Sequence, residues 1–138
     1  MAVKPQVMAE AAQSIAAAVA QSGPVIISIA AGITIDALQA RLGADTAIVR
    51  CMPNTPALLG CGASGLYANS NVTDGQRDWA ARILTAVGII DWVPTESDVD
   101  AVTARSGSGP GCSLLVSEAM VDHGVAPGTA ADRATGLP

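Results

Sequence analysis

Four short runs of apolar, often β-branched residues alternate along the chain with segments of helical periodicity. The runs are VIISIA (25–30), TAIVRC (46–51), ASGLYA (63–68) and GIIDWV (88–93). Continuous apolar runs of this length are typical of strands that are buried on both faces of a parallel sheet. Their alternation with helices predicts an α/β fold with a mainly parallel sheet.

The segments between these runs predict helices with recognisable ends. Residues 6–21 have helical spacing of apolar residues and stop at Gly23-Pro24, and Thr34 and Gly43 delimit a shorter helix. Thr73 and Gln76 have the spacing of a capping box. The helix that they open places five residues on one apolar face: Trp79, Ala80, Ile83, Leu84 and Val87.

Two further helices are predicted nearer the end of the sequence. Ser97 with Asp100 predicts the cap of one, and CSLLVSEAMVDHG (112–124) predicts the start of a longer one. The Gly-rich interruption SGSGPG (106–111) lies between them. We interpret it as a hinge between domains rather than a phosphate cradle, because no strand leads into it.

The composition leaves the surroundings of this domain open. Half of the residues are hydrophobic, only 14% are charged, and the chain has no Phe. Small aliphatic side chains must therefore fill the core. Two interpretations fit equally well: an Ala-rich domain that is soluble by itself, or a domain whose excess apolar surface is covered by a partner subunit or by other segments.

Charge and cysteine content argue against several classes of protein. The net charge is −5 with a single Lys, so a nucleic-acid partner is not expected. No apolar run approaches the roughly 20 residues of a membrane helix, so a membrane partner is not expected either. The three cysteines, Cys51, Cys61 and Cys112, lack C-x-x-C spacing. They predict free thiols in a reducing cytoplasm, with neither disulfides nor a metal site.

The stretch GCGASG (60–65) matches the dinucleotide-binding pattern G-x-G-x-x-G. That pattern binds pyrophosphate only when a strand leads into the first Gly and a helix starts at the last one. Here the Pro-containing loop MPNTPALL precedes it and the strand-like LYA follows. We therefore predict that this stretch is not a pyrophosphate loop.

Four segments together resemble one enzyme family. They are AVKPQVM (2–8), ISIAAGIT (27–34), RCMPNTPALLGCGASGLYAN (50–69) and DAVTARSGSGP (100–110). In this order and spacing they resemble pyrroline-5-carboxylate reductase. The resemblance covers nearly the whole chain up to Pro110 and, more loosely, to about Gly128. Gly111-Cys112-Ser113 departs from the family pattern, which usually has Ala-Tyr there.

The resemblance implies a fold, a reaction and a cofactor. It implies a partial, Rossmann-like dinucleotide-binding domain over 1–104 and the start of a helical dimerisation domain over 105–138. The family reduces 1-pyrroline-5-carboxylate to proline with NADPH or NADH, so NADP (or NAD) is the expected cofactor and a homo-oligomer the expected assembly. The family's phosphate-binding motif precedes the AVKP segment and its substrate loop lies far beyond residue 138. We therefore expect a central fragment with little or no activity by itself.

Family residues carry over only where this sequence matches. The expected cofactor-binding residues lie in three loops at strand ends: Ala2, Val3, Lys4, Pro5, Ala30, Ala31 and Asn54. Ligands of open α/β sheets collect at the carboxyl ends of strands, which agrees with these positions. Lys4 is more often simply a surface lysine. Asn54 is equally well explained as a turn residue.

No catalytic residue is identified from the sequence. His123 is the one side chain that titrates near neutral pH when unperturbed, but its position near a helix end favours a response to the helix dipole. A second function therefore stays open beside the reductase. In that interpretation the chain is a non-catalytic α/β module that binds other chains through its apolar surface.

Overall fold

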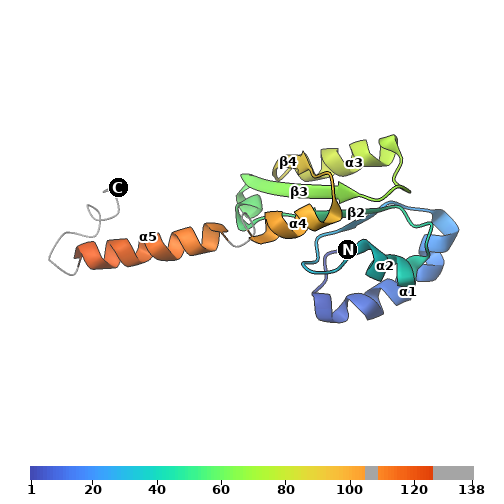
Figure 1. Cartoon of the computed structure of the whole chain (residues 1–138), viewed down its shortest axis with the longest axis horizontal. Coiled ribbons are helices and arrows are strands. Elements are labelled where there is room, and N and C mark those ends of the chain that lie inside the picture. Colours follow the sequence, from blue (N-terminus) through green and yellow to red (C-terminus); the bar gives the residue numbers. More distant parts are fainter. Residues whose placement is uncertain (105–108, 126–138) are drawn as a thin grey trace. The chain divides into compact units, whose positions relative to one another are not determined.

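The computed structural model describes residues 1–104 and 109–125 of a chain that forms two compact units, Met1–Gly107 and Ser108–Pro138. The first unit contains a four-stranded sheet in the order β1-β2-β3-β4 (Figure 1). Its strands are β1 (Ile26–Ser28), β2 (Ile48–Met52), β3 (Gly62–Ala68) and β4 (Gly88–Trp92).

Two of the three strand pairs are parallel, as the sequence predicts. β1 pairs with β2 and β3 with β4 in parallel, whereas β2 and β3 are antiparallel. The antiparallel pair follows from its connection, because a parallel crossover needs a dozen or more residues. Here only a short loop with the 3-10 turn η2 (Thr55–Leu59) joins the two strands. The predicted α/β class is confirmed.

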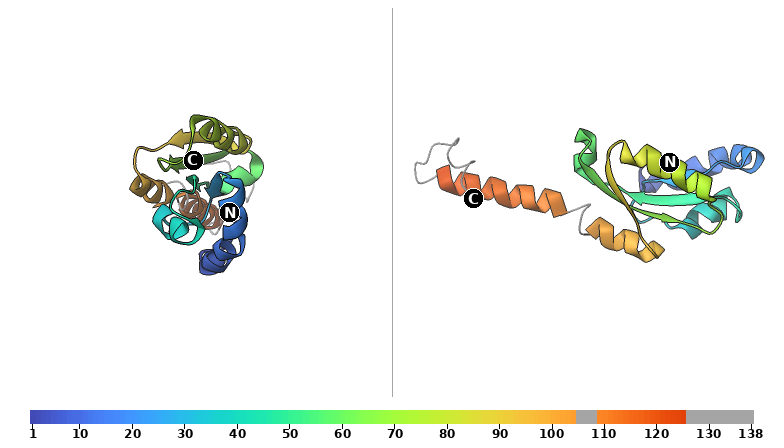
Figure 2. Two further views of the ribbon diagram at one scale, coloured as in Figure 1. Left: turned by 90° about the vertical axis from the view of Figure 1, so that its right-hand side faces the viewer. Right: turned by 90° about the horizontal axis from the view of Figure 1, so that it is seen from above.

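Helices cover both faces of the sheet (Figures 1 and 2). One face carries α1 (Met8–Ser22), α2 (Ile35–Leu42) and α4 (Glu96–Val102), and the other carries α3 (Asp74–Thr85). Alternate residues of β2 face alternate layers, as the period of a strand requires. Ile48 packs among α1 and α2, whereas Val49 and Cys51 pack beneath α3.

Most of the predicted helix ends are confirmed. The Thr34 hydroxyl accepts a hydrogen bond from the Ala37 amide, and α2 ends at Gly43. Thr73 and Gln76 form the predicted capping box. The predicted cap of α4 is wrong. The helix begins at Glu96, so Ser97 lies inside it, and the capping box is Thr95 with Asp98.

The predicted apolar face of α3 is only partly buried. Ala80 and Leu84 are buried against β3, but Trp79 and Ile83 are 62% and 61% exposed. Val87 lies beyond the end of the helix at Thr85. A single helical stripe cannot be wholly buried where the helix lies over one edge of a narrow sheet, so this prediction overestimates the core.

The second unit contributes one described element, α5 (Gly109–Val125). This confirms the predicted helix, and Gly109 opens it. Residues 106–108 of the Gly-rich interruption lie outside the described residues. Apolar side chains of α5 are exposed in this chain: Leu114, Leu115, Val116 and Met120. Among the helices of the described ranges, none is long and apolar enough to span a membrane.

Candidate functional site

The three loops that carry the predicted cofactor-binding residues, 2–5, 29–34 and 53–54, leave the sheet at one edge. β1 and β2 are parallel neighbours, so loop 29–34 and loop 53–54 follow strand ends at the same edge. Met1 extends this arrangement beside β1. Its amino group donates to the Ile27 carbonyl, and its own carbonyl accepts from the Ile29 amide. This is the pattern of a parallel neighbour, so loop 2–5 also leaves the sheet at this carboxyl edge.

Loop 2–5 is exposed and turns directly into a helix. Ala2, Val3, Lys4 and Pro5 are all exposed. Pro5 begins the 3-10 turn η1 (Pro5–Val7), which continues into α1. Pro5 and Ile33 line one cavity of about 240 Å³ between α1 and α2, so loops 2–5 and 29–34 are close in space.

Loop 29–34 is held at its start by a short polar contact. The Ser28 hydroxyl accepts a hydrogen bond from the Ala30 amide at 3.4 Å. Ala30 is buried, Ala31 is exposed, and Gly32 follows with a left-handed φ of 72° that other residues rarely adopt. The two small side chains leave the backbone accessible to a flat ligand at Ala31.

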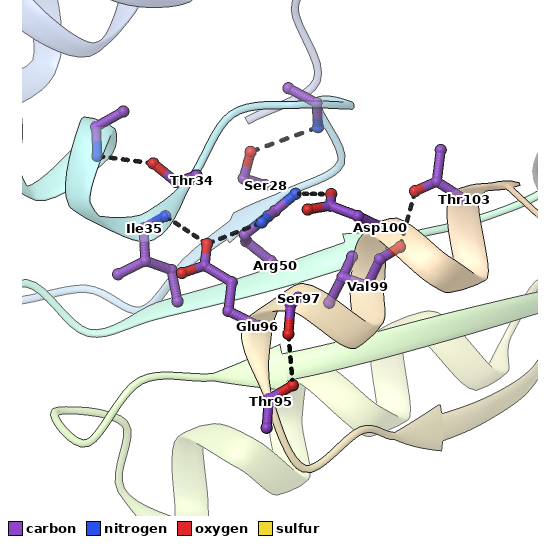
Figure 3. Close-up of polar contacts among 12 residues, drawn as sticks. Ser28, Thr34, Ile35, Arg50, Thr95, Glu96, Ser97, Val99, Asp100 and Thr103 are labelled. Atoms are coloured by element: carbon purple, nitrogen blue, oxygen red, sulfur yellow. Dashed lines mark hydrogen bonds and ion pairs between the residues drawn. The ribbon is translucent and has the colours of Figure 1, made fainter.

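Behind this loop lies a charge cluster around a buried arginine, which the sequence did not predict (Figure 3). Arg50, in the middle of β2, is 3% exposed. Its guanidinium donates to Glu96 Oε1 at 2.8 Å and to Asp100 Oδ1 at 3.1 Å. Glu96 Oε1 also accepts from the Ile35 amide at 2.7 Å. A buried charge needs such partners, and these join β2, α2 and α4.

A signal for this cluster is present in the sequence. Arg50 interrupts the otherwise apolar run TAIVRC, and a charged residue inside a buried strand requires a partner. Glu96 and Asp100 are four residues apart and therefore lie on the same side of a helix. Sequence alone does not show which acidic pair among several is turned toward β2.

Asn54 has a structural role at the third loop. Its side-chain oxygen Oδ1 accepts a hydrogen bond from the Ala63 amide at 2.9 Å, which closes the turn between β2 and β3. This contact supports the interpretation of Asn54 as a turn residue. The two Nδ2 donors of Asn54 take no part in this contact and are the groups that the side chain can offer a ligand.

In the structure the GCGASG stretch has a packing role. It runs from η2 into β3, and no helix starts at Gly65. A Cβ on Gly62 would lie 2.7 Å from the Ala57 Cβ, and one on Gly65 would lie 2.9 Å from Val102 Cγ2. Glycine is required there because β3 approaches η2 and α4 closely.

A cavity of about 380 Å³ lies at the opposite edge of the sheet. It is lined by residues of the loops before β1, β2 and α3, including Pro24, Thr46 and Asn71. None of the seven predicted cofactor-binding residues lines it. Its position at the amino ends of β1 and β2 is not where open α/β sheets usually bind ligands.

Comparisons with known proteins connect this geometry with one family. A family model described as pyrroline-5-carboxylate reductase dimerisation matches residues 96–137. The curated pyrroline-5-carboxylate reductase of Pseudomonas aeruginosa is 48% identical over 137 residues, which are 99% of this chain and 50% of that protein. That of Haemophilus influenzae is 48% identical over 120 residues, which are 87% and 44% of the two proteins. The chain belongs to the pyrroline-5-carboxylate reductase family.

Solved structures of reductases share the fold. The pyrroline-5-carboxylate reductase of Coxiella burnetii matches with a TM-score of 0.88 at 34% identity, over 96% of this chain and 49% of that one. The Plasmodium falciparum enzyme with NADP bound matches with a TM-score of 0.89 at 32% identity, over 98% and 53%. The chain spans about half the length of the relatives that it matches.

The segment matched by the dimerisation family model begins at Glu96, the first residue of α4. Yet α4 packs against β2 and β3 and belongs to the first compact unit. Glu96 and Asp100 therefore lie in the segment matched by the dimerisation model, yet both pair with Arg50 of the sheet.

The thiol of Cys51 in β2 is unsuited to nucleophilic catalysis. Burial raises its pKa to about 11, although a hydrogen bond with Ser64 opposes the shift. The thiol is therefore protonated at neutral pH and has little nucleophilic character. Cys51 is therefore a small hydrophobic residue of the core.

Proposed function

We propose that this chain forms the nicotinamide half of an enzyme that reduces 1-pyrroline-5-carboxylate to proline with NADPH or NADH. The observation that supports it most directly is the common carboxyl edge of loops 2–5, 29–34 and 53–54. In open α/β sheets this edge is where a nucleotide binds. Membership of the reductase family supplies the reaction class.

The chain's own residues would act by position rather than by covalent chemistry. A bound reduced nicotinamide would supply the hydride, and the protein would hold it against the imine carbon. Ala30 and Ala31 would admit the ring next to the backbone because their side chains are small. Asn54 would donate through Nδ2 to the carboxamide or to the substrate.

The cofactor is proposed as NADP, with NAD as the alternative. Support for NADP comes from the Plasmodium falciparum relative, whose structure has NADP bound. The carry-over of all seven residues, Ala2, Val3, Lys4, Pro5, Ala30, Ala31 and Asn54, is part of this proposal. So is the division into a dinucleotide-binding domain over 1–104 and a dimerisation domain over 105–138.

Titration of the chain with NADPH, followed by amide NMR, tests this proposal. We expect shift changes to concentrate in loops 2–5 and 29–34 and at Asn54. Ala31→Asp should abolish them, because the carboxylate occupies the proposed ring position, and the exposed site lets the fold persist. Ala17→Asp, at an exposed position of α1, is the matched control and should leave binding unchanged. Shifts confined to other surfaces would contradict the proposal.

An enzyme assay addresses the chain alone. Mixing it with NADPH and 1-pyrroline-5-carboxylate and following the nicotinamide absorbance measures turnover. Because the chain spans about half the length of its relatives, we expect little or no proline formation. Robust turnover would show that the loops described here suffice for the reaction.

A second candidate function is oligomerisation, which the exposed apolar side chains of α5 favour. Leu114, Leu115, Val116 and Met120 lie in the segment matched by the dimerisation model. A helix that is apolar on several sides is normally buried. We propose that these side chains pack against a second copy in a cytoplasmic homo-oligomer. Light scattering at several concentrations measures the mass, and a strictly monomeric chain would contradict this proposal.

A further inference from the structure

The end of loop 29–34 is held by a hydrogen bond to a residue far away in the sequence. Ile35 is the first residue of α2, and its amide is one of the four N–H groups that a helix start leaves without an intrahelical acceptor. The Thr34 side chain serves the Ala37 amide instead. The acceptor for Ile35 is Glu96 Oε1 at 2.7 Å, from a residue 61 positions later.

Glu96 is itself fixed by a buried cation. Its Oε1 lies 2.8 Å from Arg50 Nη1, and the Arg50 side chain is 4% exposed. A carboxylate that accepts from both a guanidinium and a helix-start amide makes charge-assisted hydrogen bonds on two sides. Figure 3 shows the Glu96 side chain between Arg50 and the Ile35 amide. Its carboxylate therefore has a defined place relative to β2.

We infer that Glu96 is a positioning residue that sets the conformation of loop 29–34 at the nicotinamide site. Ser28 fixes the start of this loop through the Ala30 amide, and Glu96 fixes its end through the Ile35 amide. Gly32, with its left-handed φ, lies between the two anchors. The inference rests on the proposed function for its ligand, but the loop geometry can be measured without a ligand.

Asp100 provides a matched control on the same helix. Its carboxylate also pairs with Arg50, at 3.1 Å, whereas the contact with the α2 amide is made by Glu96. Asp100→Ala therefore weakens the cluster while leaving the Glu96–Ile35 contact in place. Glu96→Ala removes both contacts of Glu96. Glu96→Gln keeps a neutral acceptor for the Ile35 amide and tests rescue without the charge.

Hydrogen exchange at individual amides, read by NMR on the full chain, measures the loop directly. In Glu96→Ala we expect exchange at Ile35 to rise by about tenfold or more, the size expected for losing a hydrogen bond to a charged group. The amides of residues 30–34 should shift as well. Glu96→Gln should restore most of the protection, and Asp100→Ala should leave it close to that of the unchanged chain.

NADPH titration of the same variants connects the loop to the ligand. We expect Glu96→Ala to weaken binding by about fivefold or more, a common lower bound for coupling between a conformational change and a ligand. Asp100→Ala should bind like the unchanged chain. Equal exchange in Glu96→Ala and Asp100→Ala would overturn the positioning role. Altered exchange with unaltered NADPH affinity would overturn its connection to the ligand.

The two proposals fail in different ways. If the unchanged chain binds no NADPH while Glu96→Ala still releases the Ile35 amide, the proposed function fails and the anchoring of the loop stands. If Glu96→Ala does not fold, Glu96→Gln carries the test. Exchange at Ile35 that rises more in Glu96→Gln than in Asp100→Ala then supports the inference, because a neutral acceptor bonds the amide more weakly than a carboxylate. Equal exchange in the two variants overturns it.

Discussion

The two faces of the sheet are joined to their helices by different forces. On the α3 face, Val49 and Leu66 pack against Ala80 and Leu84 through apolar contacts, and the Arg77 guanidinium lies 4.0 Å from the centre of the Trp92 ring. On the α4 face, a buried guanidinium and two carboxylates make directional hydrogen bonds. Apolar packing keeps two elements together without fixing one atom's position. Directional contacts fix individual groups, and loop 29–34 is anchored on the face that has them.

The largest expected effect comes from leaving the buried guanidinium without carboxylates. The double variant Glu96→Ala with Asp100→Ala should lower the free energy of unfolding by about 3–5 kcal/mol, because Arg50 remains buried and unpaired. Urea denaturation measures this. Adding Arg50→Met to the double variant removes the stranded charge and should recover part of the loss. A triple variant no more stable than the double would show that charge does not dominate this face.

On the α3 face, the corresponding change removes volume instead of charge. Leu66 is fully buried in β3, and Leu66→Ala should cost about 2–5 kcal/mol through lost burial and the cavity left behind. The loss should be the same at low and high salt, because the substitution removes no charge. Leu59→Ala, at a position 83% exposed, is the control and should change stability little. A strong salt dependence for Leu66→Ala would break the distinction between the faces.

The same distinction explains what the sequence predicts well. Helix ends such as Thr34 and Thr73 depend on neighbours three residues away, so local spacing identifies them. The Arg50–Glu96 contact joins residues 46 positions apart, and its geometry depends on how α4 crosses the sheet. The wrong cap for α4 has a different cause, since Thr95 with Asp98 and Ser97 with Asp100 have the same local spacing and the spacing does not distinguish between them. The family resemblance located the three loops, but their common edge depends on strand order, which periodicity does not specify.

Gly65 tests how closely α4 approaches β3. A Cβ there would lie 2.9 Å from Val102 Cγ2, so Gly65→Ala should destabilise the chain by about 1–3 kcal/mol through overpacking. Gly75→Ala is the matched control in α3, where a Cβ meets no atom within 4 Å. It should stabilise the helix by up to about 1 kcal/mol. Thermal unfolding measures both changes, and a neutral Gly65→Ala would mean that α4 is loosely seated.

Cys51 makes the apolar face sensitive to pH in a defined window. Its pKa is about 11 in the folded chain and 9.0 for an unperturbed thiol. The stabilisation from keeping this thiol protonated is present below pH 9 and is lost as the pH rises toward 11. A thiol reagent at neutral pH should therefore modify the exposed Cys61 and Cys112 before Cys51. Cys51→Ala should flatten the alkaline decrease in stability, and an unchanged decrease would assign it to other groups.

The smallest effect is expected on the outer side of α3, and it decides between the two interpretations of the composition. Trp79→Gln and Ile83→Gln replace side chains that are more than half exposed, so each should change stability by less than about 0.5 kcal/mol if this surface faces water. If a partner covers this surface, both substitutions should be costly, and each should lower the mass measured by light scattering because it weakens the assembly. Leu84→Gln, at the buried residue next to Ile83, should be costly in either case. If Trp79→Gln and Ile83→Gln change neither the stability nor the mass, the outer side of α3 faces water. The exposed apolar side chains of α5 are then the surface that a partner would cover.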